Sequence, residues 1–114
     1  MMNLIVEMEW IDAATVWAKL TGRMTLGMSL HEVESKINQA AQNGTRKLIL
    51  DLSGVEYADS AALGMIMLLY GKMKIHGGQL RLVAPDKQLR NLFKITSTDS
   101  ILTIVPDRAT ALAD

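Results

Sequence analysis

Cysteine is absent from this chain of 114 residues, which excludes disulfides, thiolate metal sites and a cysteine nucleophile. Aromatic residues make up only 4% of the sequence, whereas the hydrophobic class as a whole reaches 49%. The core is therefore expected to be aliphatic, with Leu, Ile, Val, Ala and many of the eight Met residues. A chain of this length can bury a core without metal or disulfides, so residues 1–114 are predicted to form one domain.

Net charge is also absent, because twelve Lys and Arg residues balance twelve Asp and Glu residues. The basic residues are interleaved with acidic ones, whereas nucleic-acid binding usually needs a basic surplus. Hydrophobic runs are short, since the longest, 61–70, is far below the roughly 20 residues that span a bilayer. Residues 1–4 lack the features of a signal peptide. We therefore expect a cytoplasmic protein that binds no nucleic acid and inserts into no membrane.

Hydrophobic periodicity divides the chain into alternating strands and helices. Strands are predicted at 3–10, 15–21, 47–52, 79–84 and 101–105, and helices at 30–41, 60–76, from 86 past 93, and 107–113. The first two strands form a hairpin, and the later ones are separated by single helices, which requires crossover connections. The predicted fold is α/β: a mostly parallel mixed sheet of four to five strands, with an N-terminal edge hairpin and about four helices packed against it.

Residues with special backbone or capping chemistry set the expected element ends. Ser29 is expected to cap the first helix and Asn43-Gly44 to stop it, while Gly77-Gly78 should close the second helix. Asp86 is the expected cap of the third helix. Ser53-Gly54 is expected to be a turn that breaks the apolar strand 47–52.

An Asp-Ser pair, Asp59-Ser60, stands where the predicted loop meets the second helix. One interpretation is structural, because a Ser N-cap contributes about 1 kcal/mol and an Asp beside a helix start favours the helix dipole. The other interpretation is a displayed partner site. The flanking residues are small, and the following helix is apolar nearly all round. One side of that helix must face the sheet, and the remaining apolar residues either contact neighbouring helices or form an exposed apolar patch beside the hydroxyl.

The stretch 48–64, LILDLSGVEYADSAALG, resembles the signature of the STAS domain family, the sulfate-transporter and anti-sigma-factor-antagonist fold. The strand that follows Gly77-Gly78 is similar to the next strand of that family, and the resemblance covers roughly residues 4–113. It implies the STAS fold for this chain.

The resemblance also implies a function. In antagonists of this family, the serine that matches Ser60 is phosphorylated by an anti-sigma factor that is also a serine kinase. The unmodified antagonist binds this kinase and so releases a sigma factor, and phosphorylation breaks the complex. Carried over, Ser60 is the phosphorylation site, and no cofactor is implied. The expected partner contacts are Thr25, Ser53, Gly54, Asp59, Ser60, Ala61, Ala62, Leu63 and Met65.

Two segments depart from the family pattern. Gly22-Arg23-Met24-Thr25 has Thr25 where the antagonist branch often carries an acid near the phosphorylated serine. Ala61-Ala62 replaces the usual Ser-Gly after Ser60. Relatives without the full motifs serve as scaffold subunits or as partners of lipid-transporting ABC ATPases. A non-switching subunit of such a transporter or scaffold is therefore the alternative function, and a homodimer through the edge hairpin stays open.

Catalytic motifs are missing from the sequence. The histidines are His31 and His76, and His76 lies roughly 24 Å from Ser60 along a helix of 1.5 Å rise per residue. This distance does not test His31, which opens another predicted helix, but both histidines are expected to be solvated surface residues. A serine nucleophile needs its base within hydrogen-bond reach. There is no nucleophile elbow, phosphate-binding Gly-rich loop or metal-ligand cluster. The chain is therefore predicted to be a binding protein and not an enzyme, with no bound metal or cofactor.

Overall fold

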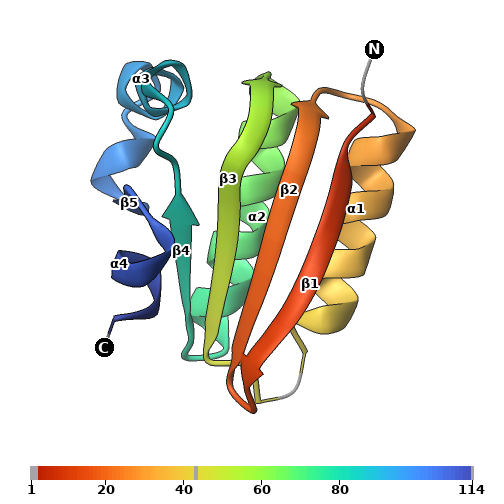
Figure 1. Cartoon of the computed structure of the whole chain (residues 1–114), viewed down its shortest axis with the longest axis vertical. Helices are drawn as coiled ribbons and strands as arrows, with labels where there is room; N and C mark the ends of the chain where they lie inside the picture. The colour runs from red at the N-terminus through yellow and green to blue at the C-terminus, as the bar shows by residue number, and fades with distance from the viewer. Residues whose placement is uncertain (1–2, 43, 114) are drawn as a thin grey trace.

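The computed structural model describes residues 3–42 and 44–113 and contains a mixed five-stranded sheet (Figure 1). The strands are β1 (Ile5–Asp12), β2 (Thr15–Met24), β3 (Lys47–Ala58), β4 (Gln79–Val83) and β5 (Thr103–Val105), and they lie side by side in chain order. β1 and β2 form an antiparallel hairpin, whereas β2, β3, β4 and β5 pair in parallel. The predicted edge hairpin and largely parallel sheet are both confirmed.

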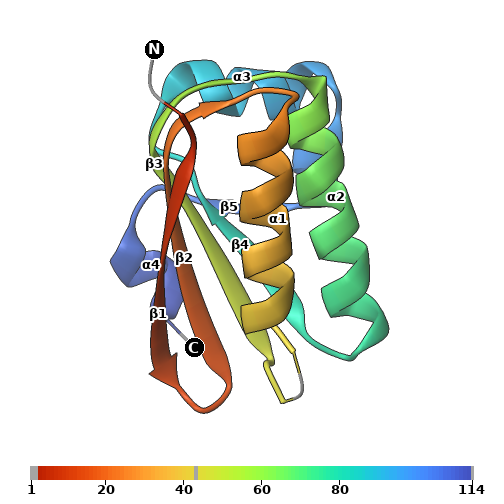
Figure 2. The same cartoon turned by 90° about the vertical axis from the view of Figure 1, so that its right-hand side faces the viewer.

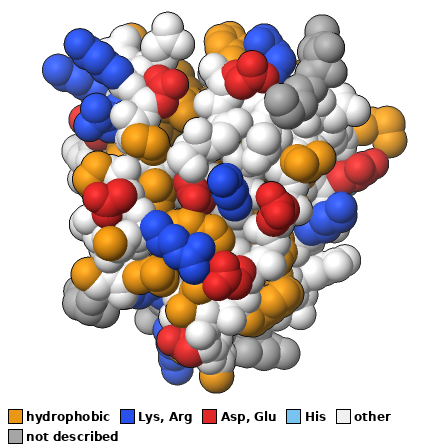
Figure 3. Space-filling model, in the orientation of Figure 1, with side chains coloured by type: hydrophobic (Ala, Val, Ile, Leu, Met, Phe, Trp, Pro, Cys, Tyr) orange, Lys and Arg blue, Asp and Glu red, His pale blue; other side chains and the backbone are white. Residues whose placement is uncertain are grey.

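Four α-helices accompany the sheet in the described part of the chain. They are α1 (Met28–Ala40), α2 (Ser60–Ile75), α3 (Lys87–Ile95) and α4 (Arg108–Leu112), and a short 3-10 helix, η1 (Thr98–Ser100), follows α3. Figure 2 shows α1 and α2 side by side on one face of the sheet, with α3 across its end and α4 on the opposite face. The second face is thus covered only in part, and Figure 3 shows charged and hydrophobic side chains interspersed on it.

Two apolar clusters hold these layers together. The larger cluster lies between the sheet and α1, α2 and α3, and includes Leu50, Ile66 and Phe93, which are fully buried. The smaller one lies on the opposite face, where Ala111 of α4 packs with Trp17, Ile49 and Val83. Because successive residues of β3 face opposite sides, the apolar run Leu48–Leu52 supplies both clusters. The prediction of a central strand covered on both faces is confirmed.

Several predicted element ends change in the structure. The N-cap of α1 is Gly27, not Ser29, and no side chain caps this helix. Ser29 lies inside the first turn, because the glycine at φ 154 lets the chain enter the helix earlier than a side-chain cap would. Gly77, at φ 76, follows α2 as predicted. In the predicted stop at Asn43-Gly44, Asn43 lies outside the described residues, while Gly44 has φ 91.

The expected turn at Ser53-Gly54 is wrong, because β3 continues to Ala58. Between Lys19 and Thr21 of β2 the pairing shifts from Asp51 to Gly54 on β3, which marks a bulge. A Cβ at Gly54 would lie 2.8 Å from Thr21 Oγ1 and 2.9 Å from the Leu20 carbonyl oxygen. The glycine therefore serves the close approach of two parallel strands and does not reverse the chain.

Candidate functional site

Asp59 is the single residue between β3 and α2. Ala58, the last residue of β3, pairs with Met24, the last residue of β2. The next backbone N–H, that of Asp59, donates to the Met24 carbonyl oxygen at 3.1 Å. The strand therefore passes directly into the helix without the intervening loop that the sequence suggested, and this junction lies beside the segment that joins β2 to α1.

The Asp59 carboxylate is held by three backbone N–H donors. Its Oδ1 accepts from Ala61 at 2.9 Å and Ala62 at 3.0 Å, which caps the first turn of α2. Its Oδ2 accepts from Leu26 at 2.9 Å, in the segment before α1. Asp59 therefore ties the start of α2 to the chain that precedes α1, and its main role in this structure is to hold the junction.

The same bonds explain the ionisation of Asp59. Desolvation of the half-buried carboxyl group acts to raise its pKa, but the backbone N–H groups of Leu26, Ala62 and Ala61 stabilise the charged form more strongly. The pKa of Asp59 consequently lies below its usual value of 3.8. The N-terminal end of the α2 dipole favours the same charge.

Ser60 is the first residue of α2, and it is exposed. The sequence left open whether this serine is itself the N-cap, and the structure gives that role to Asp59. Within residues 3–42 and 44–113, no group forms a hydrogen bond with the Ser60 hydroxyl. The side chain is therefore free for a partner or a modifying enzyme, because it has no structural bond to lose.

An apolar groove runs beside Ser60, between the N-terminal parts of α1 and α2. It measures about 580 Å³ and is open to solvent. Leu26 is 82% exposed and Leu68 is 68% exposed at its border, and Met67, which also lines the groove, is half-buried and packs against the core. Met28, next to the groove, is 79% exposed. Large apolar side chains gathered in this way mark interaction surfaces more often than isolated ones do.

The structure brings together only part of the predicted contact set. Thr25 is half-buried and lies between Met24 and Leu26, which both bond to Asp59, so it adjoins the junction. Ala61 and Leu63, in the first turn of α2, are half-buried.

The other members lie deeper or farther away. Ala62 is fully buried and Met65 is 3% exposed, so in this conformation both side chains support the surface from beneath rather than form it. Ser53 and Gly54 belong to the interior of β3, and the four residues from Gly54 to Ala58 place Gly54 about 13 Å from the end of the strand, with Ser53 farther still.

Leu26, Met28 and Leu68 were not singled out by the sequence reasoning. Leu26 and Met28 flank a glycine just before a helix, and that pair of large apolar residues in a connecting segment is the signal that could have revealed them. Leu68 could not be separated from its neighbours on α2, because that helix is apolar on every side.

Groups with catalytic or metal-binding chemistry lie apart. His31 and His76 are both exposed, at the start of α1 and the end of α2. Across residues 3–42 and 44–113, no three His, Cys, Asp or Glu side chains gather where they could hold a metal ion. No helix in the same part of the chain is long and apolar enough to cross a membrane.

The fold and the junction together define a small α/β domain that displays a serine where a parallel strand enters a capped helix. The chain belongs to the STAS domain family, whose model matches residues 19–111. The resemblance of the stretch LILDLSGVEYADSAALG to that family is therefore confirmed, and so is the predicted fold.

Curated relatives carry names of the antagonist type. A Thermotoga neapolitana protein, named as an anti-sigma factor antagonist and TM1081 homologue, is 34% identical over 71 residues, 62% of this chain and 63% of that protein. The match thus spans less than two thirds of that relative. BtrV of Bordetella bronchiseptica, also named as an anti-sigma factor antagonist, is 27% identical over 72% of this chain and 71% of its own length.

Solved structures agree on the fold. The anti-sigma factor antagonist SpoIIAA in its unphosphorylated form superposes with a TM-score of 0.74 at 17% identity, covering 93% of this chain and 92% of that one. An anti-sigma factor antagonist from Mycobacterium paratuberculosis gives a TM-score of 0.78 at 21% identity, covering 96% and 92%. This chain is accordingly a STAS domain similar to anti-sigma factor antagonists.

Proposed function

We propose that this chain is an anti-sigma factor antagonist that binds an anti-sigma factor serine kinase and is released from it by phosphorylation of Ser60. The observation that carries the proposal is the exposed Ser60 hydroxyl, which has no bond within the described residues, beside an open apolar groove. The names of the curated relatives support the same role. Regulatory binding without catalysis also fits the family.

Charge explains how one phosphate could act as the switch. A phosphoserine carries about −1.5 to −2 charges at neutral pH. At the first position of α2 that charge faces the positive end of the helix dipole, so the free domain tolerates it. Against an apolar or acidic partner surface the same charge is desolvated and repelled. A difference of about 2.8 kcal/mol weakens binding ~100-fold, so the modification can dissociate a complex without altering the fold.

The groove supplies the apolar part of the proposed contact. Leu26 and Leu68 are large and mostly exposed, and they lie on the two sides of the groove next to Ser60. Apolar side chains that leave water on binding provide affinity, while phosphorylation of the serine at the edge of the same surface would lower that affinity. Asp59 fixes the two sides of the groove relative to each other, because its carboxylate accepts hydrogen bonds from Leu26 and from the first turn of α2.

The test combines binding and phosphorylation. The chain is incubated with a candidate serine kinase and ATP, and the peptide containing Ser60 is analysed by mass spectrometry. Calorimetry then measures kinase affinity for the parent chain, Ser60→Asp and Ser100→Asp. We expect phosphate on Ser60, a loss of about 100-fold in kinase affinity for Ser60→Asp with nearly unchanged thermal stability, and unchanged kinase affinity for the control Ser100→Asp. Binding of Ser60→Asp with parental affinity would contradict the switch.

One observation favours a second function. Thr25, which stands where antagonists often carry an acid, adjoins Asp59 through the bonds of its two neighbours. A kinase that recognises an acidic side chain at this position would find the hydroxyl of Thr25 instead. The alternative is a non-switching subunit of a transporter or scaffold that uses the same groove, and its signature is partner binding that Ser60→Asp leaves intact.

A further inference from the structure

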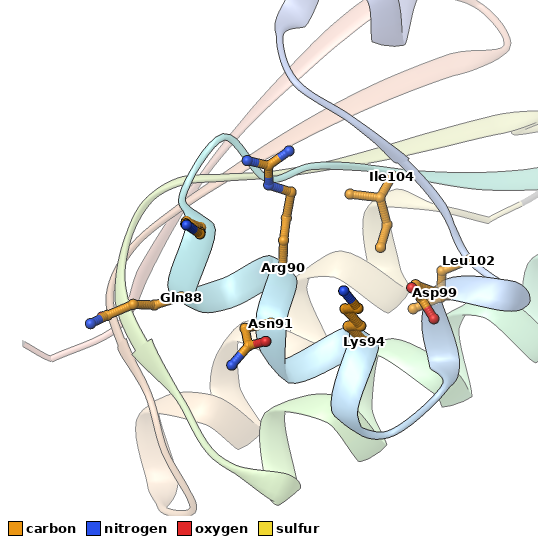
Figure 4. A pocket seen from close by; sticks show the side chains of 8 residues that line it. Gln88, Arg90, Asn91, Lys94, Asp99, Leu102 and Ile104 are labelled. Carbon is orange, nitrogen blue, oxygen red and sulfur yellow. The ribbon is translucent and has the colours of Figure 1, made fainter.

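A second hollow lies away from Ser60, between α3 and β5. Figure 4 shows Arg90 and Lys94 of α3 on one side of this space, and Asp99, Leu102 and Ile104 on the other. Its volume of about 770 Å³ is open to solvent and lies in the range typical of small-molecule sites. Leu102 is buried and Ile104 half-buried, so the hollow has an apolar floor.

Three cations line this hollow from one side of α3. Lys87, Arg90 and Lys94 are spaced by three and four residues, which places them along one face of the helix. The face that enters the core carries Leu89 and Phe93 instead.

The charge of this stripe is not neutralised. Across residues 3–42 and 44–113, none of the three side chains forms an ion pair or a hydrogen bond. Asp99 is the one acid among the residues that line the hollow, so the local charge is +2 in a chain whose net charge is zero. Like charges three and four residues apart on one helix face repel each other. An anion that binds among them would relieve this repulsion.

We propose that this hollow binds a small phosphomonoester with an apolar or aromatic group. The phosphate carries about −1.5 to −2 charges, which matches the local surplus, and Arg and Lys are the usual phosphate ligands of proteins. The guanidinium of Arg90 and the ammonium of Lys94 bind the phosphate oxygens. The apolar group covers Leu102 and Ile104, which a bare inorganic anion would leave in water.

This site shares no lining residue with the groove beside Ser60. The two proposals are therefore independent. A ligand in the hollow can be tested on the isolated domain without any kinase, and failure of the kinase experiment leaves it untouched.

The experiment is an amide NMR titration at physiological ionic strength in a phosphate-free buffer. Phenyl phosphate, inorganic phosphate and benzoate are the probes. We expect phenyl phosphate to shift the amides of Arg90, Asn91, Lys94 and Ile104 and to bind at least ten-fold more tightly than either other probe. The double variant Arg90→Gln/Lys94→Gln should lose at least ten-fold in affinity for it. Ile104→Ala should reduce the preference for phenyl phosphate over inorganic phosphate.

The matched control is Lys19→Gln/Lys36→Gln, which removes the same charge from two exposed lysines elsewhere. It should bind phenyl phosphate like the parent. The proposal is overturned if both double variants weaken binding equally, since the effect would then be one of net charge. It is also overturned if inorganic phosphate or benzoate binds as tightly as phenyl phosphate, or if no probe shifts these amides.

Discussion

The carboxylate of Asp59 holds the backbone of Leu26, with 2.9 Å between its Oδ2 and the Leu26 nitrogen, although 33 residues separate them in sequence. Oδ1 of the same carboxylate caps α2. Leu26, the most exposed large apolar side chain at the border of the groove, is therefore fixed through its own backbone to the helix that begins with Ser60. The position of the serine and the position of the apolar surface depend on a single acid.

Replacing Asp59 with Ala should lower stability more than replacing another N-cap of this chain. Loss of an N-cap acid costs about 0.5–2 kcal/mol, and Asp59 also loses its bond to Leu26, so we expect about 2 kcal/mol. Asp86 accepts from Gln88 alone, and Asp86→Ala should cost about 1 kcal/mol. Urea unfolding of both variants measures the difference, and equal losses would show that the link to Leu26 contributes nothing.

The contribution of Asp59 should depend on pH. Its pKa is lowered in the folded state, because the bonds from Leu26, Ala62 and Ala61 outweigh the desolvation that opposes them. The charged form is thus favoured by folding, so the stabilisation is fully present above the usual pKa of 3.8 and is lost as pH falls through the lower folded value.

The measurement is the difference in unfolding free energy between the parent chain and Asp59→Asn from pH 7 downward. This difference should be constant near neutrality and should shrink below about pH 4. The pKa values of Asp12 and Asp107 are also lowered, by bonds from the backbones of Ala14 and Thr110, and both carboxylates remain in each protein. Subtraction therefore removes their effect. A difference that grows on acidification would contradict the assignment.

The close approach at the bulge in β3 can be tested by replacing Gly54 with Ala, with Gly71 of α2 as the matched control. A Cβ at Gly54 would meet the Leu20 carbonyl oxygen at 2.9 Å, and backbone cannot move aside cheaply, so Gly54→Ala should destabilise by about 1–3 kcal/mol. Gly71 lies inside α2, where an added Cβ would have nothing within 4 Å, and Gly71→Ala should stabilise by about 0.5–1 kcal/mol. Thermal unfolding reports both, and stabilisation by both substitutions would remove the close-approach explanation.

The order of elements could be predicted because it rests on local signals. Alternation along Gln79–Val83, the three- and four-residue spacing of Leu30, Val33 and Ile37, and the cap at Asp86 each belong to a short stretch of chain. The full length of β3 could not be predicted in the same way. Gly54 looks like a turn residue by itself, and only the approach of β2 explains why it lies within a strand.

The sequence pointed to the polar residues of the candidate site but not to the exposed apolar residues around them. Asp59 and Ser60 stood out because of their residue types and their place before a helix. Which apolar residues of α2 stay exposed depends on how α1 packs beside it, so Leu68 could not be distinguished from buried Leu69 by sequence. Leu26 is exposed because the bond to Asp59 holds its backbone at the surface, a contact between distant parts of the chain.

Substitutions of Leu68 and Ile75 test whether the partner binds at the groove or at any exposed apolar residue. Both are exposed apolar residues of α2, Leu68 at 68% beside the groove and Ile75 at 82% at the far end of the helix. Leu68→Glu should weaken binding of the kinase partner at least ten-fold, about 1.4 kcal/mol, whereas Ile75→Glu should leave it unchanged. Calorimetry with the same partner measures both affinities. Equal effects of the two substitutions would remove the groove from the interface.

Arg108 holds α4 over the opposite face of the sheet. Its guanidinium lies 4.4 Å from the centre of the Trp17 ring, and its Nη2 is 3.1 Å from Glu9 Oε2. Trp17 is only 3% exposed even though α4 is five residues long. An exposed cation–π contact contributes about 0.5–1 kcal/mol, and the half-exposed ion pair adds at most a similar amount. We therefore expect Arg108→Ala to cost about 1 kcal/mol and to open the cover above Trp17.

Acrylamide quenching of tryptophan fluorescence in a Trp10→Phe background isolates Trp17, because Trp10, which is 60% exposed, would otherwise dominate the signal. Arg108→Ala should make Trp17 more accessible to the quencher. The matched control is Arg23→Ala, which removes a similar contact over Tyr57 at 4.8 Å and should leave Trp17 unchanged. If quenching of Trp17 does not rise in Arg108→Ala, the cover is maintained by Arg81, which donates to the carbonyl oxygens of Ala111 and Ala113, and not by Arg108.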